Sequence, residues 1–130
     1  MATHDSIGDF LTIVRNASRA GKESCTTQWS RIREGIASIL KDEGYISNYE
    51  VSGDVKKQLT ITMKYIDGVP AITGITREST PGCRRYFEYR SIPRVLNGMG
   101  ISILTTSQGV LKDSDCRTKK AGGEILCKVW

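Results

Sequence analysis

Residues 30–51, SRIREGIASILKDEGYISNYEV, decide the fold class because the spacing of apolar residues changes within them. The first part has the helical repeat, with apolar side chains at Ile32, Ile36, Ile39 and Leu40. Ser30 is placed to cap the start of this helix, and Gly44 is suited to end it in a left-handed conformation. The following residues, YISNYEV, are typical of a strand. The stretch therefore predicts a helix followed directly by a β-strand.

The strand pattern continues after a short turn. In KQLTITMKYI, residues 57–66, apolar side chains alternate with polar ones, at Leu59, Ile61, Met63 and Tyr65. This period of two predicts a strand with one buried face. A Gly53–Asp54 turn separates it from the preceding strand, so we expect the two strands to form a β-hairpin.

The N-terminal residues predict another helix. In SIGDFLTIVRNA, residues 6–17, the helical repeat places apolar side chains at Ile7, Phe10, Leu11 and Val14. Ser6 and Asp9 have the spacing of a capping box, and we expect the helix to end near Gly21. A short strand is expected at residues 25–27. The predicted order in this half of the chain is α-β-α-β-β.

Residues 67–70, DGVP, form a predicted linker to a second module, so we expect modules at residues 1–68 and 69–130. The second module has strand patterns at residues 71–78, 84–90, 100–106 and 122–130. It also has short helical patterns at residues 91–98 and 113–120. The sequence thus predicts an α+β fold, in which an N-terminal α-β-α-β-β module packs against a mostly β C-terminal module with one or two short helices.

Basic residues gather in the second half of the chain. The 130 residues are 38% hydrophobic and carry a formal net charge of +5. From Val69 onward there are 10 Lys and Arg against 5 Asp and Glu, so this half carries the whole excess. Such a charge favours a polyanionic partner. No run approaches the roughly 18 apolar residues that span a bilayer, and no signal-peptide pattern is present, so we expect a cytoplasmic protein.

The sequence has no pattern typical of a catalytic or metal site. His4, the only histidine, is interpreted as a solvated residue, and the common nucleophile and phosphate-loop motifs are missing. The cysteines, at positions 25, 83, 116 and 127, include no C-x-x-C pair. We interpret them as small buried side chains rather than as zinc ligands or a disulfide. We therefore expect no catalytic residue, metal or cofactor.

Three hydroxyl side chains follow one another in LTTSQGV, residues 104–110. Hydroxyls both donate and accept, so they suit a phosphate, a base edge or the ribose 2′-hydroxyls that line the shallow minor groove of RNA. Gly122 and Gly123 would let backbone approach backbone, and Glu124 could accept from a base or a sugar. Spacing alone leaves an alternative open, namely ordinary turn chemistry with Gly122–Gly123 as a plain helix stop.

Several motifs together resemble the S-eight family, the bacterial small-subunit ribosomal proteins of number eight. These are DSIGDFLTIVRNA (5–17), ILKDEGYI (39–46), STPGCRRY (79–86) and the C-terminal stretch from IPRVLNG to GGEILCKVW (92–130). The resemblance implies the two-part α+β fold and a primary, non-enzymatic role in binding the central domain of small-subunit ribosomal RNA during assembly. It also implies neighbouring ribosomal proteins as partners and, in many bacteria, feedback repression through the messenger RNA of the protein's own operon.

The resemblance implies which residues contact RNA. The family's hydroxyl loop corresponds to Thr105, Thr106, Ser107 and Gly109, with Gly122, Gly123 and Glu124 beside it and Tyr86 as a face for a base. Phosphate contacts are expected from Arg31, Arg33, Arg84, Arg85, Lys119 and Lys120. Of these, Arg31 and Arg33 correspond to the family's basic pair that contacts a second RNA surface. The family's first-helix motif corresponds to Arg15 and Asn16.

Two other classes of protein are alternatives. The first is a small nuclease or hydrolase, which the lack of an acid–base pair argues against. The second is a protein-interaction module whose basic half meets an acidic partner, and it predicts no preference for RNA over other polyanions.

Overall fold

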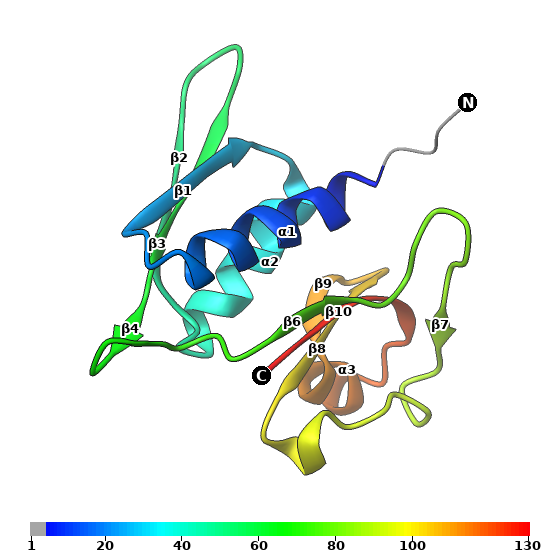
Figure 1. Ribbon diagram of the computed structural model, residues 1–130. Helices are drawn as coiled ribbons and strands as arrows, with labels where there is room; N and C mark the ends of the chain where they lie inside the picture. Colours follow the sequence, from blue (N-terminus) through cyan, green and yellow to red (C-terminus); the bar gives the residue numbers. More distant parts are fainter. Residues whose placement is uncertain (1–4) are drawn as a thin grey trace.

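The computed structural model describes residues 5–130, so His4 lies outside the described residues. The N-terminal half has the predicted order, with α1 (Ser6–Arg19), β1 (Ser24–Gln28), α2 (Arg31–Asp42), β2 (Ile46–Ser52) and β3 (Gln58–Met63). The three strands form an antiparallel sheet in the order β1-β3-β2, and both helices lie against it (Figure 1). The predicted hairpin of β2 and β3 is confirmed.

The C-terminal half is mostly β-structure. It contains β6 (Ile75–Arg77), β7 (Tyr86–Phe87), β8 (Ile101–Thr106), β9 (Gly109–Lys112), α3 (Asp113–Lys119) and β10 (Gly123–Val129). The strands form an antiparallel sheet in the order β6-β10-β8-β9, with the short β7 also paired to β10. The predicted α+β fold class is therefore confirmed, and β10 pairs with β6, β7 and β8, while β9 pairs with β8.

The main hydrophobic core lies between the two sheets, and α1 and α2 contact both of them. Both halves contribute side chains with almost no exposed surface, among them Phe10, Leu11, Ile36, Leu40, Ile75, Ile103, Leu126 and Val129. A smaller cluster beside α3 contains Ile92, Leu104, Cys116 and Ile125. Complete burial of one such side chain contributes about 1.5–3 kcal/mol, so packing across the two halves is a major source of stability.

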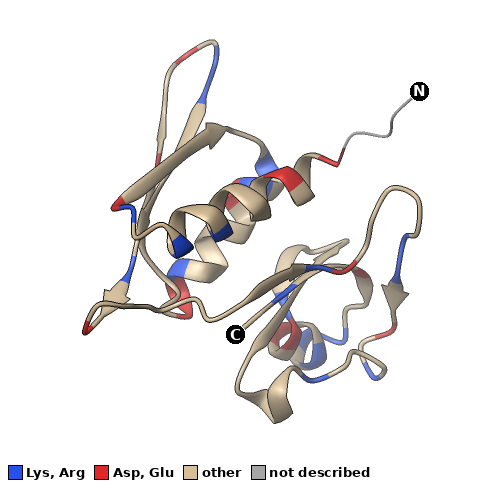
Figure 2. Ribbon diagram, viewed as in Figure 1, with Lys and Arg blue, Asp and Glu red and all other residues tan. Residues whose placement is uncertain are grey.

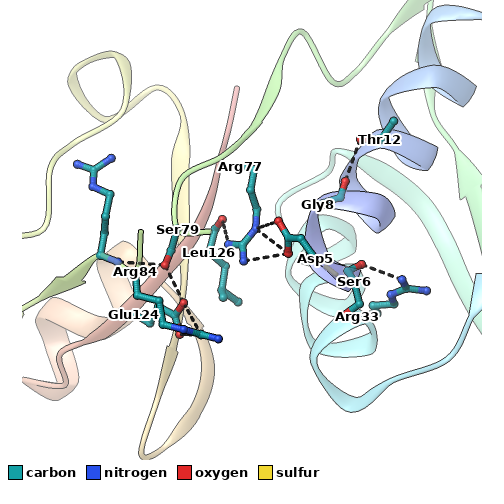
Figure 3. A network of polar contacts seen from close by, with 11 residues as sticks. Asp5, Ser6, Gly8, Thr12, Arg33, Arg77, Ser79, Arg84, Glu124 and Leu126 are labelled. Carbon is teal, nitrogen blue, oxygen red and sulfur yellow. Dashed lines mark hydrogen bonds and ion pairs between the residues drawn. The ribbon is translucent and has the colours of Figure 1, made fainter. Parts of the chain in front are cut away.

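Polar contacts also join the start of α1 to the C-terminal sheet. Arg77 on β6 lies 3.0 Å from the Asp5 carboxylate and donates to the Leu126 carbonyl at 2.8 Å (Figure 3). Burial of Asp5 opposes its ionisation, but the hydrogen bond and charge of Arg77 together with the backbone N–H groups of Gly8 and Ile7 outweigh it, and the net effect lowers the pKa of the carboxyl. Farther along α1, Arg15 donates through Nε to the Ile75 carbonyl at 3.1 Å.

The predicted caps of α2 are confirmed, whereas the cap of α1 differs by one residue. The Ser30 hydroxyl accepts from the Arg33 N–H at 3.1 Å, and Gly44 follows the helix with a φ of 82°. In α1, Asp5 occupies the N-cap position and Ser6 is already helical, so the predicted capping box is wrong.

Two C-terminal elements and the predicted linker differ from their predictions. The helix predicted at 91–98 is only a 3₁₀ turn (Leu96–Gly98), because Leu96 and Asn97 have positive φ angles of 48° and 56°, which no α-helix contains. The strand predicted at 84–90 pairs only at Tyr86–Phe87. The predicted linker is a hairpin of β4 (Tyr65–Ile66) and β5 (Val69–Pro70), turning through left-handed residues at Asp67 and Gly68.

The cysteines are unpaired thiols in different surroundings. Cys116 and Cys127 are buried, as predicted, and burial raises the pKa of Cys127 to about 12. Cys83 is exposed, so the prediction of a buried thiol is wrong there. Within residues 5–130, no helix has the length and apolar character needed to cross a membrane.

Candidate nucleic-acid interface

In the loop between β8 and β9, the hydroxyls of Thr106 and Ser107 differ in their hydrogen bonding. The Thr106 hydroxyl donates to the Gly109 carbonyl at 2.9 Å and accepts from the Gln108 N–H at 3.1 Å, so it stabilises the turn. Ser107 at the tip is exposed, and among the described residues its hydroxyl has no hydrogen-bond partner. Gly109 has a φ of 108°, a conformation that residues with a side chain rarely adopt. The loop therefore keeps a fixed shape and leaves the Ser107 hydroxyl available to a ligand.

Gly122 and Gly123 let β10 lie close to its neighbours. A Cβ on Gly123 would be 2.1 Å from the Thr105 carbonyl oxygen, and one on Gly122 would be 2.6 Å from the Phe87 carbonyl oxygen. The alternative of a glycine helix stop does not hold, because α3 ends at Lys120 in a left-handed conformation with a φ of 54°. The glycines thus serve close approach between strands.

Two residues of β10 bring the hydroxyl loop together with the basic turn, residues 80–86, which carries Arg84 and Arg85 and leads into β7. The first, Gly123, faces Thr106 of β8 on one side and Phe87 of β7 on the other. The second, Glu124, faces Thr105 and Tyr86 in the same way. Tyr86 is 66% exposed, so its ring is open to a partner beside the loop.

The segment leading into β7 carries positive charge, as Figure 2 shows. The Arg84 side chain is 53% exposed and its Nη1 lies 3.2 Å from the Glu124 carboxylate. Arg85 is bound to Glu78 at 2.6 Å, and its guanidinium lies 5.5 Å from the centre of the Phe87 ring. Each arginine therefore has an acidic partner that fixes its position beside Tyr86.

Arg31 and the hydroxyl loop line one groove. It has a volume of about 590 Å³ and lies between α2 and the loop, with Thr105, Thr106, Ser107 and Gly109 in its wall. Arg31 is exposed at the start of α2. Two acidic residues, Asp42 and Asp115, also line the groove, so its charge is mixed rather than uniformly positive.

Arg33 lies inside the fold, with 8% of its surface exposed. Its guanidinium donates to the Thr27 hydroxyl at 2.6 Å and to the carbonyls of Gln28 at 2.9 Å and Ser6 at 2.7 Å. These bonds join α2 to β1 and α1. We therefore withdraw the expected phosphate contact of Arg33, because a buried guanidinium with three protein acceptors does not reach a ligand at the surface.

The other predicted residues are distributed over the surface. Lys119 and Lys120 are exposed at the end of α3. Asn16 is exposed on α1, in a depression that it shares with Lys22 and Cys25. Arg15 lines a different pocket, of about 370 Å³, together with Trp130. Neither pocket includes the hydroxyl loop, so the first-helix pair forms no part of the same surface.

Sequence reasoning did not single out Ser79, which is fully buried under the basic turn. Its hydroxyl donates to Glu124 at 2.7 Å (Figure 3). The partners are 45 residues apart in the chain, and no local pattern signals such a pair. Among the residues that the structure describes, no group of three or more His, Cys, Asp or Glu side chains could hold a metal ion.

The surface thus presents hydroxyls, an open aromatic ring and positioned arginines, which suit a nucleic acid. A family model described as Ribosomal protein S8 matches residues 5–130. A protein named Small ribosomal subunit protein uS8 from Opitutus terrae is 56% identical over 128 residues, which cover 97% of this chain and 98% of that protein.

Two further relatives carry the same name. The one from Anaeromyxobacter dehalogenans is 50% identical over 132 residues and covers 100% of both chains. The one from Neisseria meningitidis serogroup C is 47% identical over 129 residues, which cover 99% of each chain. Similarity therefore extends over the whole length and includes every part of the surface described above.

Proposed function

The chain belongs to the Ribosomal protein S8 family, the S-eight family, and we propose that it binds the central domain of small-subunit ribosomal RNA through the hydroxyl loop and the basic turn. It is a structural protein of the small ribosomal subunit, not an enzyme.

The observation that carries the proposal is the meeting of two segments at Gly123 and Glu124. Between them, these two residues pair with both Thr105–Thr106 and Tyr86–Phe87. As a result, hydroxyls, an aromatic ring and the Arg84 guanidinium lie at one end of the five-stranded sheet. Thr105 and Tyr86 both pair with Glu124, and the Arg84 guanidinium lies 3.2 Å from the carboxylate of that residue.

Each of these groups would make a different kind of contact with RNA. Ser107 and Thr105 would meet ribose hydroxyls and base edges, for which an uncharged donor and acceptor is suited. Tyr86 would stack on a base, an interaction that contributes about 1–3 kcal/mol per base in single-stranded nucleic acids. Exposed cations would contact phosphates and supply affinity that falls as salt rises.

Three further groups would contact RNA beside or beyond the loop. Arg31 shares the groove with the loop and would meet the backbone of the same RNA element. Lys119 and Lys120 would contact RNA beyond the end of α3. Arg15 and Asn16 would face a separate RNA surface, since they share no pocket with the loop.

The test is equilibrium binding to a hairpin from the central domain of the ribosomal RNA, against a scrambled hairpin of equal length, across a salt titration. Specific recognition predicts that the cognate hairpin keeps an advantage of roughly a thousandfold or more as salt rises. If the two affinities fall together and become equal, the binding is electrostatic only, and the protein-interaction alternative gains support.

Ser107→Ala tests the loop directly. We expect it to weaken cognate binding by about 1–3 kcal/mol, the range for a well-placed base-edge contact, and to leave scrambled RNA unaffected. Cognate binding as tight as that of the parent protein would contradict the role of the loop.

The same surface would bind any RNA that presents the same shape, including an element in the protein's own operon messenger RNA. We propose that binding to this messenger element represses translation of the operon. We also propose that the protein is located in the cytoplasm, with the ribosome. A competition experiment checks the first point: the messenger element should displace the ribosomal hairpin in a one-to-one manner.

A further inference from the structure

Ser79 lies at the centre of the polar contacts beneath the proposed RNA surface. It is 0% exposed, and its hydroxyl donates to Glu124 Oε2 at 2.7 Å (Figure 3). Ser79 Oγ in turn accepts from the Arg85 backbone N–H at 3.0 Å. One buried hydroxyl thus connects the β10 carboxylate to the backbone of the basic turn.

The basic turn has few other connections to the body of the protein. Thr80 and Cys83 bond each other through two backbone hydrogen bonds, at 3.0 and 3.2 Å, which close the turn on itself. The Arg85 carbonyl accepts from the Ile125 N–H at 3.0 Å. Only two residues of β7 pair with β10. The Ser79 bonds therefore make up much of what fixes this turn above Glu124.

Arg84 depends on the same carboxylate. Its Nη1 lies 3.2 Å and 3.3 Å from the two oxygens of Glu124, while half of its side chain is exposed. Because Ser79 holds one of these oxygens, the carboxylate presents a fixed edge to Arg84. Ser79 thus fixes the orientation of the exposed Arg84 guanidinium through the Glu124 carboxylate.

We propose that Ser79 is a positioning residue for RNA recognition, which orients Glu124 and the turn bearing Arg84 and Tyr86 without contacting RNA. This inference rests on the proposed function. Removing the hydroxyl frees the carboxylate and the turn to take other orientations, while the net charge of the surface stays the same. The loss should therefore fall on discrimination between RNAs and not on general electrostatic attraction.

Ser79→Ala tests the proposal, and Ser102→Ala is its matched control. Ser102 is likewise 0% exposed and lies in the same sheet, but its hydroxyl has no partner among the described residues. Ser79→Ala should weaken cognate binding by roughly tenfold or more, the range for a hydrogen bond to a charged group. Scrambled binding and the salt dependence should stay unchanged, and Ser102→Ala should bind as the parent protein does.

A double-mutant cycle separates positioning from a general loss of structure. If Ser79 acts through Glu124, then Ser79→Ala added to Glu124→Ala should lower cognate affinity by no more than about twofold beyond Glu124→Ala alone. Thermal unfolding of each variant shows that the protein binding RNA is folded.

Three outcomes overturn the inference. They are unchanged cognate binding by folded Ser79→Ala, an equal loss on cognate and scrambled RNA, or full additivity with Glu124→Ala. These results differ from failure of the proposed function, in which the parent protein itself would show no preference for the cognate hairpin.

Discussion

The three-stranded sheet and the RNA-facing end of the five-stranded sheet are built by different interactions. Strands β1, β2 and β3 pair over five or six positions each and bury a regular apolar face against two helices. By contrast, β7 pairs at two positions, and its turn is fixed by one buried serine, two glycines and ion pairs. The structure of the first region is stabilised by buried apolar area, whereas the structure of the second depends on the positions of a few polar atoms. Mutations should therefore affect stability in the first and recognition in the second.

The largest expected effect is on the shared core. Phe10 has no exposed surface and lies among side chains of both halves. Phe10→Ala should lower the free energy of unfolding by about 3–5 kcal/mol, measured by urea denaturation. The fraction that stays folded should bind the cognate hairpin normally. A loss below 1 kcal/mol would contradict the assignment of Phe10 to the central core.

Gly123→Ala should destabilise the protein less than Phe10→Ala does, but it should also weaken RNA binding. Its new Cβ would come within 2.1 Å of the Thr105 carbonyl, so β8 and β10 must move apart at the site. We expect a loss of stability of about 1–3 kcal/mol, as for overpacking, together with a clear loss of cognate RNA affinity. Gly82→Ala is the control, because a Cβ there meets nothing within 4 Å. If Gly123→Ala and Gly82→Ala had the same stability and the same cognate RNA affinity, the proposed difference between the two regions would be contradicted.

Ser30→Ala tests the region of the three-stranded sheet, where a mutation should change stability and not RNA recognition. The Ser30 hydroxyl caps α2 at 3.1 Å, and its loss should cost about 1 kcal/mol of stability. Thermal unfolding measures the shift, with Ser52→Ala at the exposed end of β2 as a control. Cognate RNA affinity should not change, since Ser30 lies outside the proposed surface. A loss of RNA affinity at unchanged stability would contradict this separation.

The smallest expected effect concerns pH and the contact between the halves. The pKa of Asp5 is lowered from its ordinary value of 3.8 in the folded protein. Its pair with Arg77 therefore adds stability at pH values above 3.8, and that stability is lost as the pH falls through the lowered folded pKa. Asp5→Asn should remove about 1 kcal/mol or less at neutral pH, and less at an acidic pH below the lowered folded pKa. An equal loss at both pH values would show that Asp5 acts through packing instead.

Features that depend on neighbouring residues could be predicted from the sequence. The α2 helix and its caps at Ser30 and Gly44 follow from apolar spacing and local backbone preference, and the alternation in β3 predicts its buried face. Close approach at Gly122 and Gly123 was one of two interpretations that the sequence left open, and only the end of α3 at Lys120 and the neighbouring carbonyls decide between them.

Features that depend on distant partners could not be predicted in this way. Residues 91–98 have a helical pattern, but burial of Ile92 and Val95 on either side of Pro93 accompanies a turn with positive φ angles instead. Arg33 looks like a surface cation until Thr27 and Ser6 are placed around it. Ser79 meets Glu124 only because β10 returns beside the basic turn, and no local signal shows this.

The position of β10 in the chain has a consequence for synthesis on the ribosome. All three of its partners, β6, β7 and β8, precede it, so this sheet cannot close until residues 123–129 have left the exit tunnel. The three-stranded sheet, by contrast, is complete once Met63 has emerged. A nascent chain stopped after β8 but before residue 123 exposes Ile75, Ile101 and Ile103 without β10 to cover them, and exposed apolar surface of this kind promotes aggregation. The last strand made thus protects the apolar residues of both halves.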